Sequence, residues 1–166
     1  MKIRNMAQIG LCAALICLCG FISVPAGVFV FTLQSFGVFF ALFLLGGRRG
    51  CWAILTYLAL GAVGLPVFSG FQGGLGALLG ATGGYLWGFL LAGVVCWPLA
   101  KKSLVLAAVT GMAVCYAAGT LWYGYQYLGG NLLAAAAQCV LPYVLPDGIK
   151  ITLAYLVAKK LKRLVY

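Results

Sequence analysis

Asp147 and Lys150 are the two residues whose chemistry and spacing most clearly indicate a binding site. Asp147 is the only acidic residue among 166, and Lys150 follows it three positions later, at the start of an apolar run. Side chains at this spacing project from the same face of a helix. Charges in such apolar segments are costly and usually functional, so we favour a clamp for a polar ligand. The alternative is that Asp147 stabilises a helix N-terminus and Lys150 only neutralises it.

Uncharged polar side chains elsewhere could complete such a site for an amide-like or ureido ligand. The candidates are Thr32, Gln34, Thr82 and Tyr85. Thr82 lies in a glycine-rich stretch, residues 70–84, and Tyr85 directly follows it. Backbone N–H groups near Gly74 could wrap a small ligand there, because glycine permits close backbone approach. A tight turn between two helices would explain the same glycines.

Other kinds of chemistry are disfavoured by what the sequence lacks. It has no histidine and one carboxylate, so it supplies no paired carboxylates, catalytic triad or metal-ligand cluster. Its seven cysteines lie in apolar runs and are interpreted as small buried hydrophobic residues. No Walker sequence for phosphate binding is present. We therefore expect no enzyme activity, catalytic residue, metal or cofactor, and any transport must take its energy from a partner or an ion gradient.

The composition indicates that these residues are held in a membrane. Hydrophobic residues make up 65% of the chain and charged residues 7%, and the mean hydropathy is +1.13. Soluble domains carry roughly a quarter charged residues. A chain this short has too little interior to bury so many apolar side chains. We expect residues 1–166 to form a single all-α integral membrane domain whose surface is covered by the lipid bilayer.

The apolar runs predict about six transmembrane helices, since a span needs roughly 17 to 25 apolar residues. They lie at about residues 6–24, 30–45, 51–65, 85–100, 104–127 and 146–161. A further apolar run, residues 131–141, is too short to span and is interpreted as a re-entrant or interfacial segment. The other connections, at about 23–29, 67–84 and 128–145, are apolar and are expected to fold inward over a pocket on the outer side.

The basic residues predict the orientation of these helices. Eleven Lys and Arg face one acidic residue, and all but Lys150 lie in small clusters at the ends of the apolar runs. With six spans, every cluster lies on one side, which is the positive-inside pattern. Both termini are therefore predicted to be cytoplasmic, in a multi-pass protein of the cytoplasmic membrane. A nucleic-acid binder would gather its charge on a soluble face, so we expect no nucleic-acid partner.

Gly10 and Ala14, in the first predicted helix, form a pair of small residues four positions apart. Small residues at this spacing let two helices approach closely. The pair could dock a partner helix or serve packing within the bundle.

The sequence resembles BioY, the biotin-specific substrate-binding (S) component of energy-coupling factor (ECF) transporters. The resemblance covers nearly the whole chain. The segments that carry it are FISVP at 21–25, TLQ at 32–34, LLGGRRG at 44–50, GAVGLPVF at 61–68, GGLG at 73–76, GATGGYLWGF at 80–89 and LPDGIK at 145–150.

The resemblance implies an S-component bundle of six helices with a biotin pocket near the outer face. The Asp and Lys of the family's last motif contribute to biotin binding, and they match Asp147 and Lys150. The family docks a membrane coupling subunit (EcfT or BioN type) through an AxxxA face on the first helix, where this chain has Gly10 and Ala14. ATPase subunits (EcfA or BioM type) would supply the energy.

Two other functions remain as alternatives at this point. One is a free-standing secondary carrier that uses Asp147 as a proton-coupling site. The other is a membrane scaffold that binds no ligand.

Overall fold

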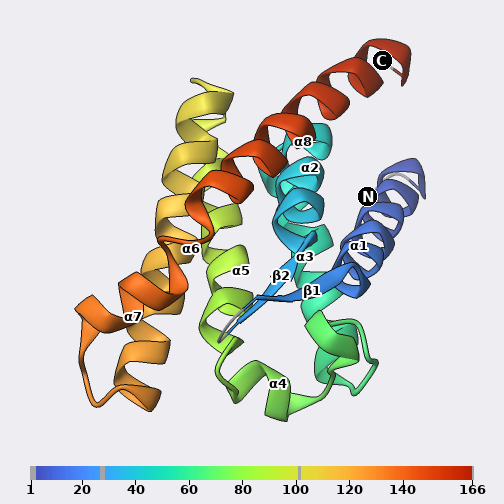
Figure 1. Ribbon diagram of the computed structural model, residues 1–166. Helices are drawn as coiled ribbons and strands as arrows, with labels where there is room; N and C mark the ends of the chain where they lie inside the picture. Colours follow the sequence, from blue (N-terminus) through green and yellow to red (C-terminus); the bar gives the residue numbers. More distant parts are fainter. Residues whose placement is uncertain (1–2, 27–28, 101, 166) are drawn as a thin grey trace.

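The computed structural model describes residues 3–26, 29–100 and 102–165, and it is largely helical (Figure 1). Within these residues, six helices have 12 residues or more. They are α1 (Ile3–Phe21), α2 (Gln34–Leu45), α3 (Gly47–Ala62), α5 (Gly83–Leu99), α6 (Leu104–Tyr127) and α8 (Val144–Val165). Shorter elements are η1 (Ser69–Phe71), α4 (Leu75–Leu79) and α7 (Leu132–Cys139).

These helices correspond one by one to the six predicted runs, but their lengths differ. By length and apolar composition, α1 and α6 could each cross a membrane, and α7 with α8, which meet at a bend of 54°, form a third candidate span. The apolar helices α2 and α5 have only 12 and 17 residues. The helical membrane fold is thus supported, and the count of six spans stays a prediction.

The chain between α1 and α2 is a β-hairpin, which corrects the sequence prediction. The second helix was expected to begin near residue 30, but β2 (Phe29–Thr32) pairs antiparallel with β1 (Ser23–Ala26), and α2 begins at Gln34. Aromatic and β-branched residues favour strands. Pairing also satisfies backbone groups that an irregular apolar connection would leave without partners.

The two ends of the bundle differ in kind (Figure 1). Both chain ends lie at one end, together with the α2–α3 and α5–α6 connections, and the β-hairpin, α4 and α7 lie at the other. We call these the basic end and the hairpin end. The described basic residues of the first are Arg4, Arg48, Arg49, Lys102, Lys159, Lys160, Lys162 and Arg163. Lys2 and Lys101 of the predicted clusters lie outside the described residues.

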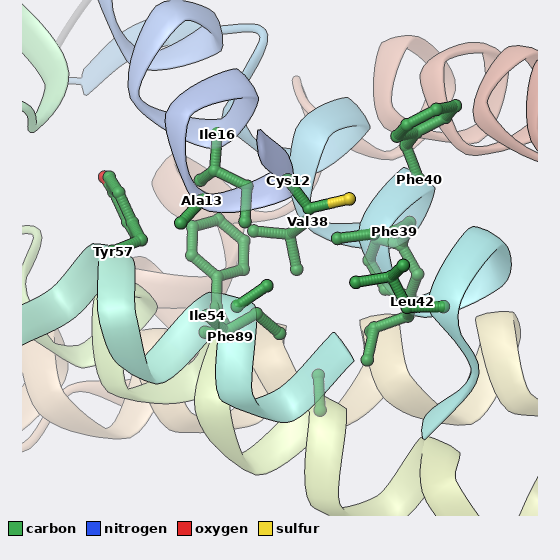
Figure 2. Close-up of a cluster of buried hydrophobic side chains, with 14 of the residues drawn as sticks. Cys12, Ala13, Ile16, Val38, Phe39, Phe40, Leu42, Ile54, Tyr57 and Phe89 are labelled. Atoms are coloured by element: carbon green, nitrogen blue, oxygen red, sulfur yellow. The ribbon is translucent and has the colours of Figure 1, made fainter. Parts of the chain in front are cut away.

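Helix α2 occupies the centre of the bundle and packs against α1, α3 and α8. Figure 2 shows the resulting core, in which Ile16, Val38, Phe39 and Ile54 are fully buried among side chains of neighbouring helices. Many large apolar side chains on the outer helix faces, Val109 among them, are exposed. Such a surface requires lipid rather than water around it. The central place of α2 sets its first turn inside the bundle at the hairpin end.

Candidate ligand-binding site

Asp147, in the first turn of α8, is buried at the hairpin end and accepts three hydrogen bonds from side chains. Ser35 Oγ of α2 donates to Oδ1 at 2.8 Å, and Tyr116 OH of α6 donates to Oδ2 at 2.8 Å. Lys150 Nζ donates to Oδ1 at 2.9 Å and completes an ion pair. A buried carboxylate is tolerated only with such partners. Three helices therefore converge on one charged group.

Lys150 is also buried, with 9% of its surface exposed, and it connects α8 to the β-hairpin. Its Nζ donates to the backbone oxygen of Thr32 at 2.8 Å and lies 4.0 Å from the centroid of the Phe31 ring. A cation over an aromatic face gains electrostatic stabilisation in addition to the ion pair. The Phe31 ring also stacks on Tyr143, with centroids 5.4 Å apart. The ammonium group thus holds the end of β2 against the site.

Gln34 is the first residue of α2 and is almost fully buried. Its amide Nε2 donates to the hydroxyl of Tyr57, which is itself buried in α3. This contact fixes the orientation of the amide without any ligand.

Asp147, Lys150 and Gln34 line a pocket of about 720 Å³, part of which is open to solvent. Its other lining residues are Thr32, Ser35, Phe68, Ser69, Thr82, Tyr85, Leu86, Phe89, Met112, Cys115, Tyr116, Cys139 and Tyr143. The lining combines apolar and aromatic side chains with a few converging polar groups. That combination is typical of sites for small organic molecules.

The pocket brings together all but one of the residues predicted to bind a ligand. Thr32, Gln34, Thr82, Tyr85, Asp147 and Lys150 all line it. Gly74 does not. Its backbone N–H donates to the carbonyl of Gly61 at 2.7 Å, and its φ of 83° at the start of α4 is one that glycine adopts readily. In the structure Gly74 therefore shapes the turn between α3 and α4.

Several residues of the site were not predicted from the sequence. Ser35 and Tyr116 hold the carboxylate, and the hydroxyl of Tyr85 donates to the backbone oxygen of Cys139 at 3.3 Å, which links α5 to α7. Ser35 directly follows Gln34, so its place in the first turn of α2 was a usable signal. Tyr116 lies in the middle of a long apolar helix, where nothing nearby in the sequence sets it apart.

Gly10 and Ala14 lie on the exposed face of α1. The opposite face, with Cys12, Ala13 and Ile16, is buried. A methyl group added at Gly10 would meet no other described atom within 4 Å. The pair therefore does not serve packing within the bundle, and its surface is available to lipid or to a partner helix.

Comparison with known proteins agrees with this geometry. The BioY family model matches residues 1–166. The chain belongs to the BioY family. It is 39% identical over 166 residues to the biotin transporter BioY of Thermotoga maritima, with 97% of each chain covered. It is 36% identical over 162 residues to the probable biotin transporter BioY of Pyrococcus horikoshii, with 98% of each covered.

A solved BioY-like structure shares the fold. It is the crystal structure of the S-component for biotin from an ECF-type ABC transporter, with a TM-score of 0.90 and 26% sequence identity, over 98% of this chain and 92% of that one. The resemblance stated from the sequence motifs is confirmed. BioY proteins are transporters and not enzymes, in keeping with the shortage of catalytic groups in this sequence.

Proposed function

We propose that this protein is the biotin-binding S component of an ECF-type transporter and mediates biotin uptake. The observation that carries the proposal is the buried Asp147–Lys150 pair, which lines the pocket at the hairpin end of a BioY-family bundle. The relatives named biotin transporters and the S-component for biotin support the choice of ligand.

The hydrogen-bonding capacity of the pair matches a ureido group. A carboxylate has about four acceptor positions. Among the described residues, Ser35 and Lys150 fill both positions on Oδ1 of Asp147, whereas Tyr116 fills one on Oδ2. One position on Oδ2 is left for a ureido N–H. An ammonium has three N–H donors. Among the described residues, Asp147 and Thr32 take two of those on Lys150, which leaves one for the ureido oxygen.

The remaining polar groups would contact the rest of the ligand. Gln34 comes from α2, Thr82 from the loop before α5 and Tyr85 from the first turn of α5, so they approach the pocket from sides other than α8. Gly74 would act only indirectly, through the turn that precedes α4. Calorimetric titration of the detergent-purified protein tests the whole proposal: we expect one biotin bound per chain. The absence of any heat of binding would support the ligand-free scaffold instead.

We further propose six spans with both termini in the cytoplasm, which places the pocket on the outer side of the cytoplasmic membrane. The gathering of the described basic clusters at one end of the bundle supports this orientation. A reporter fused to the C-terminus, or inserted between Arg49 and Gly50, should be cytoplasmic. One inserted near Gly73 should be external, and a cytoplasmic signal there would overturn the orientation.

Energy is proposed to come from a membrane coupling subunit of the EcfT or BioN type and ATPase subunits of the EcfA or BioM type. The exposed face around Gly10 and Ala14 is the proposed docking surface. Replacing both with Trp should abolish uptake in cells and leave biotin binding by the purified protein intact, because small residues permit close helix contact.

A matched control is available on α6, where Ala113 and Ala117 form an exposed pair of small residues with the same spacing. Trp at both of these positions should leave uptake intact. Equal loss of uptake in the two double variants would mean that bulk in the membrane, rather than docking, limits transport. A secondary carrier predicts a different pattern: uptake that collapses with an uncoupler and persists without any ATPase partner.

A further inference from the structure

A second concavity lies between α3 and α5, close to the basic end. It has a volume of about 600 Å³, which includes its open side. Its lining residues are Arg48, Cys51, Trp52, Leu55, Leu90 and Trp97. Arg48 lies in the first turn of α3 and Trp97 in the last turn of α5, so one charged group stands at the end of an otherwise apolar groove.

No described residue supplies a counterion for the charge of Arg48. The sequence contains one acidic residue, Asp147, and Lys150 already pairs with it at the hairpin end. The Arg48 side chain is exposed, and its guanidinium lies 6.0 Å from the centroid of the Trp97 ring. Arg49, in the first turn of α3, and Lys102, in the α5–α6 connection, add positive charge to the same end. An anion that neutralises Arg48 must therefore come from outside the described part of the chain.

The rest of the groove indicates what kind of anion fits. Trp52 and Trp97 have 49% and 42% of their surfaces exposed. Leu55, about one helical turn after Trp52 in α3, is also exposed. Exposed indole rings are typical of the level of the lipid headgroups. A small soluble anion would contact the guanidinium but gain nothing from these apolar walls. A phospholipid matches both parts, since its phosphate is a bidentate partner for arginine and its acyl chain is apolar.

We propose that this groove binds an anionic phospholipid, with the phosphate on Arg48 and an acyl chain lying between Trp52 and Trp97. The site is separate from the biotin pocket, which lies at the opposite end of the bundle. The inference depends on the chain lying in a membrane with its basic end at the headgroup level. It does not depend on biotin, so failure of the purified protein to bind biotin would leave it standing.

Native mass spectrometry of the full-length protein in detergent tests the site. Dioleoyl phosphatidylglycerol and dioleoyl phosphatidylcholine, which share acyl chains, are titrated separately, and bound lipid is counted per protein. Arg48→Gln should reduce the preference for phosphatidylglycerol about fivefold, given the usual contribution of one basic residue near a membrane surface. Arg48→Lys should keep part of the preference, because lysine retains the charge but not the bidentate geometry.

Arg163→Gln is the matched control. Arg163 is exposed in the last turn of α8, at the same end of the molecule but outside the groove, and its substitution removes the same charge. It should leave the preference unchanged. Equal losses in the Arg48 and Arg163 variants would overturn the proposal in favour of diffuse charge attraction. Release of the lipid by excess inorganic phosphate would overturn it in favour of a soluble anion.

A second measurement in lipid vesicles covers the case of a variant that is unstable in detergent. Brominated phosphatidylglycerol should quench the indole fluorescence of the natural protein more strongly than brominated phosphatidylcholine at equal mole fraction. This difference should be lost in Arg48→Gln. Equal quenching by the two lipids in the natural protein would show that the groove does not select an anionic headgroup.

Discussion

The hairpin end and the basic end differ in how their charged side chains are buried and paired. At the hairpin end, Asp147 and Lys150 are both buried, and Ser35, Tyr116 and the Thr32 carbonyl complete their hydrogen bonds. At the basic end, the described Lys and Arg side chains are exposed or only half-buried, and the single acidic side chain of the sequence, Asp147, lies at the opposite end. The difference teaches that a charge inside this bundle requires partners from several elements, whereas a charge at the membrane surface can rely on water and lipid.

This contrast has a direct consequence for mutation. Removing one member of a buried, hydrogen-bonded pair leaves the other member without compensation, and the penalty is large. Removing an exposed charge changes little, because solvent already screens it. Substituting a charged residue at each end therefore tests whether the buried hydrogen-bond network contributes more to stability and binding than an exposed charge does.

The largest effect is expected for Lys150→Met, compared with Lys160→Met at the basic end. The first substitution leaves Asp147 buried without its cation and should reduce the free energy of unfolding by about 3–5 kcal/mol. It should also weaken biotin binding, since one ligand donor is lost. Lys160 is exposed in the last turns of α8, so its substitution should change neither property. Thermal unfolding in detergent and calorimetric titration of the folded fraction provide the two measurements.

The next effect is expected for Asp147→Asn, which keeps the shape of the side chain but removes its charge. Hydrogen bonds to charged groups contribute about 1.5–3 kcal/mol, so biotin affinity should fall by roughly tenfold to a hundredfold. Because the two residues are coupled, Asp147→Asn combined with Lys150→Met should cost less than the sum of the single losses. If both single variants bound biotin with unchanged dissociation constants, the pair would not belong to the binding site. Asp147 would then only stabilise the N-terminus of α8, and Lys150 would only neutralise it.

Much of the fold could be predicted because apolar runs in a membrane protein are long and their ends are marked by charge, glycine or proline. The bounds of α6, residues 104–127, agree with the predicted run. The hairpin could not be predicted in this way. The apolar residues of β2 continue directly into α2, and an apolar run alone does not distinguish a buried strand from a helix. Only its pairing with β1 decides the matter.

The site was predictable to the extent that its residues are rare. A carboxylate and an amine in an apolar sequence stand out, and so do Gln34, an amide in an apolar run, and Thr82, which lies in the glycine-rich stretch. Ser35, Tyr57 and Tyr116 do not, because hydroxyl groups are common in membrane helices. Whether such a hydroxyl faces the site depends on how the helices pack, and the sequence of one helix does not contain that information.

The smallest effect is expected for Tyr116→Phe, and its comparison with Ser35→Ala sharpens the description of the pocket. Both hydroxyls donate to Asp147, but to different oxygens. Ser35→Ala removes a donor from Oδ1, where Lys150 also binds. The remaining buried charge is less well satisfied, and affinity for biotin should fall about fivefold to tenfold, as for a hydrogen bond of about 1–1.5 kcal/mol.

Tyr116→Phe instead frees a second position on Oδ2, the oxygen proposed to face the ligand. Tyr116 is only partly buried, so water can replace its hydroxyl in the empty pocket, and a ureido N–H can replace it in the complex. The ring, with its apolar contacts, is kept. The dissociation constant for biotin should therefore change by less than about threefold, which corresponds to less than about 0.7 kcal/mol. Calorimetric titration of the two variants side by side decides the point. A greater loss of affinity in Tyr116→Phe than in Ser35→Ala would mean that Oδ1, and not Oδ2, receives the ligand.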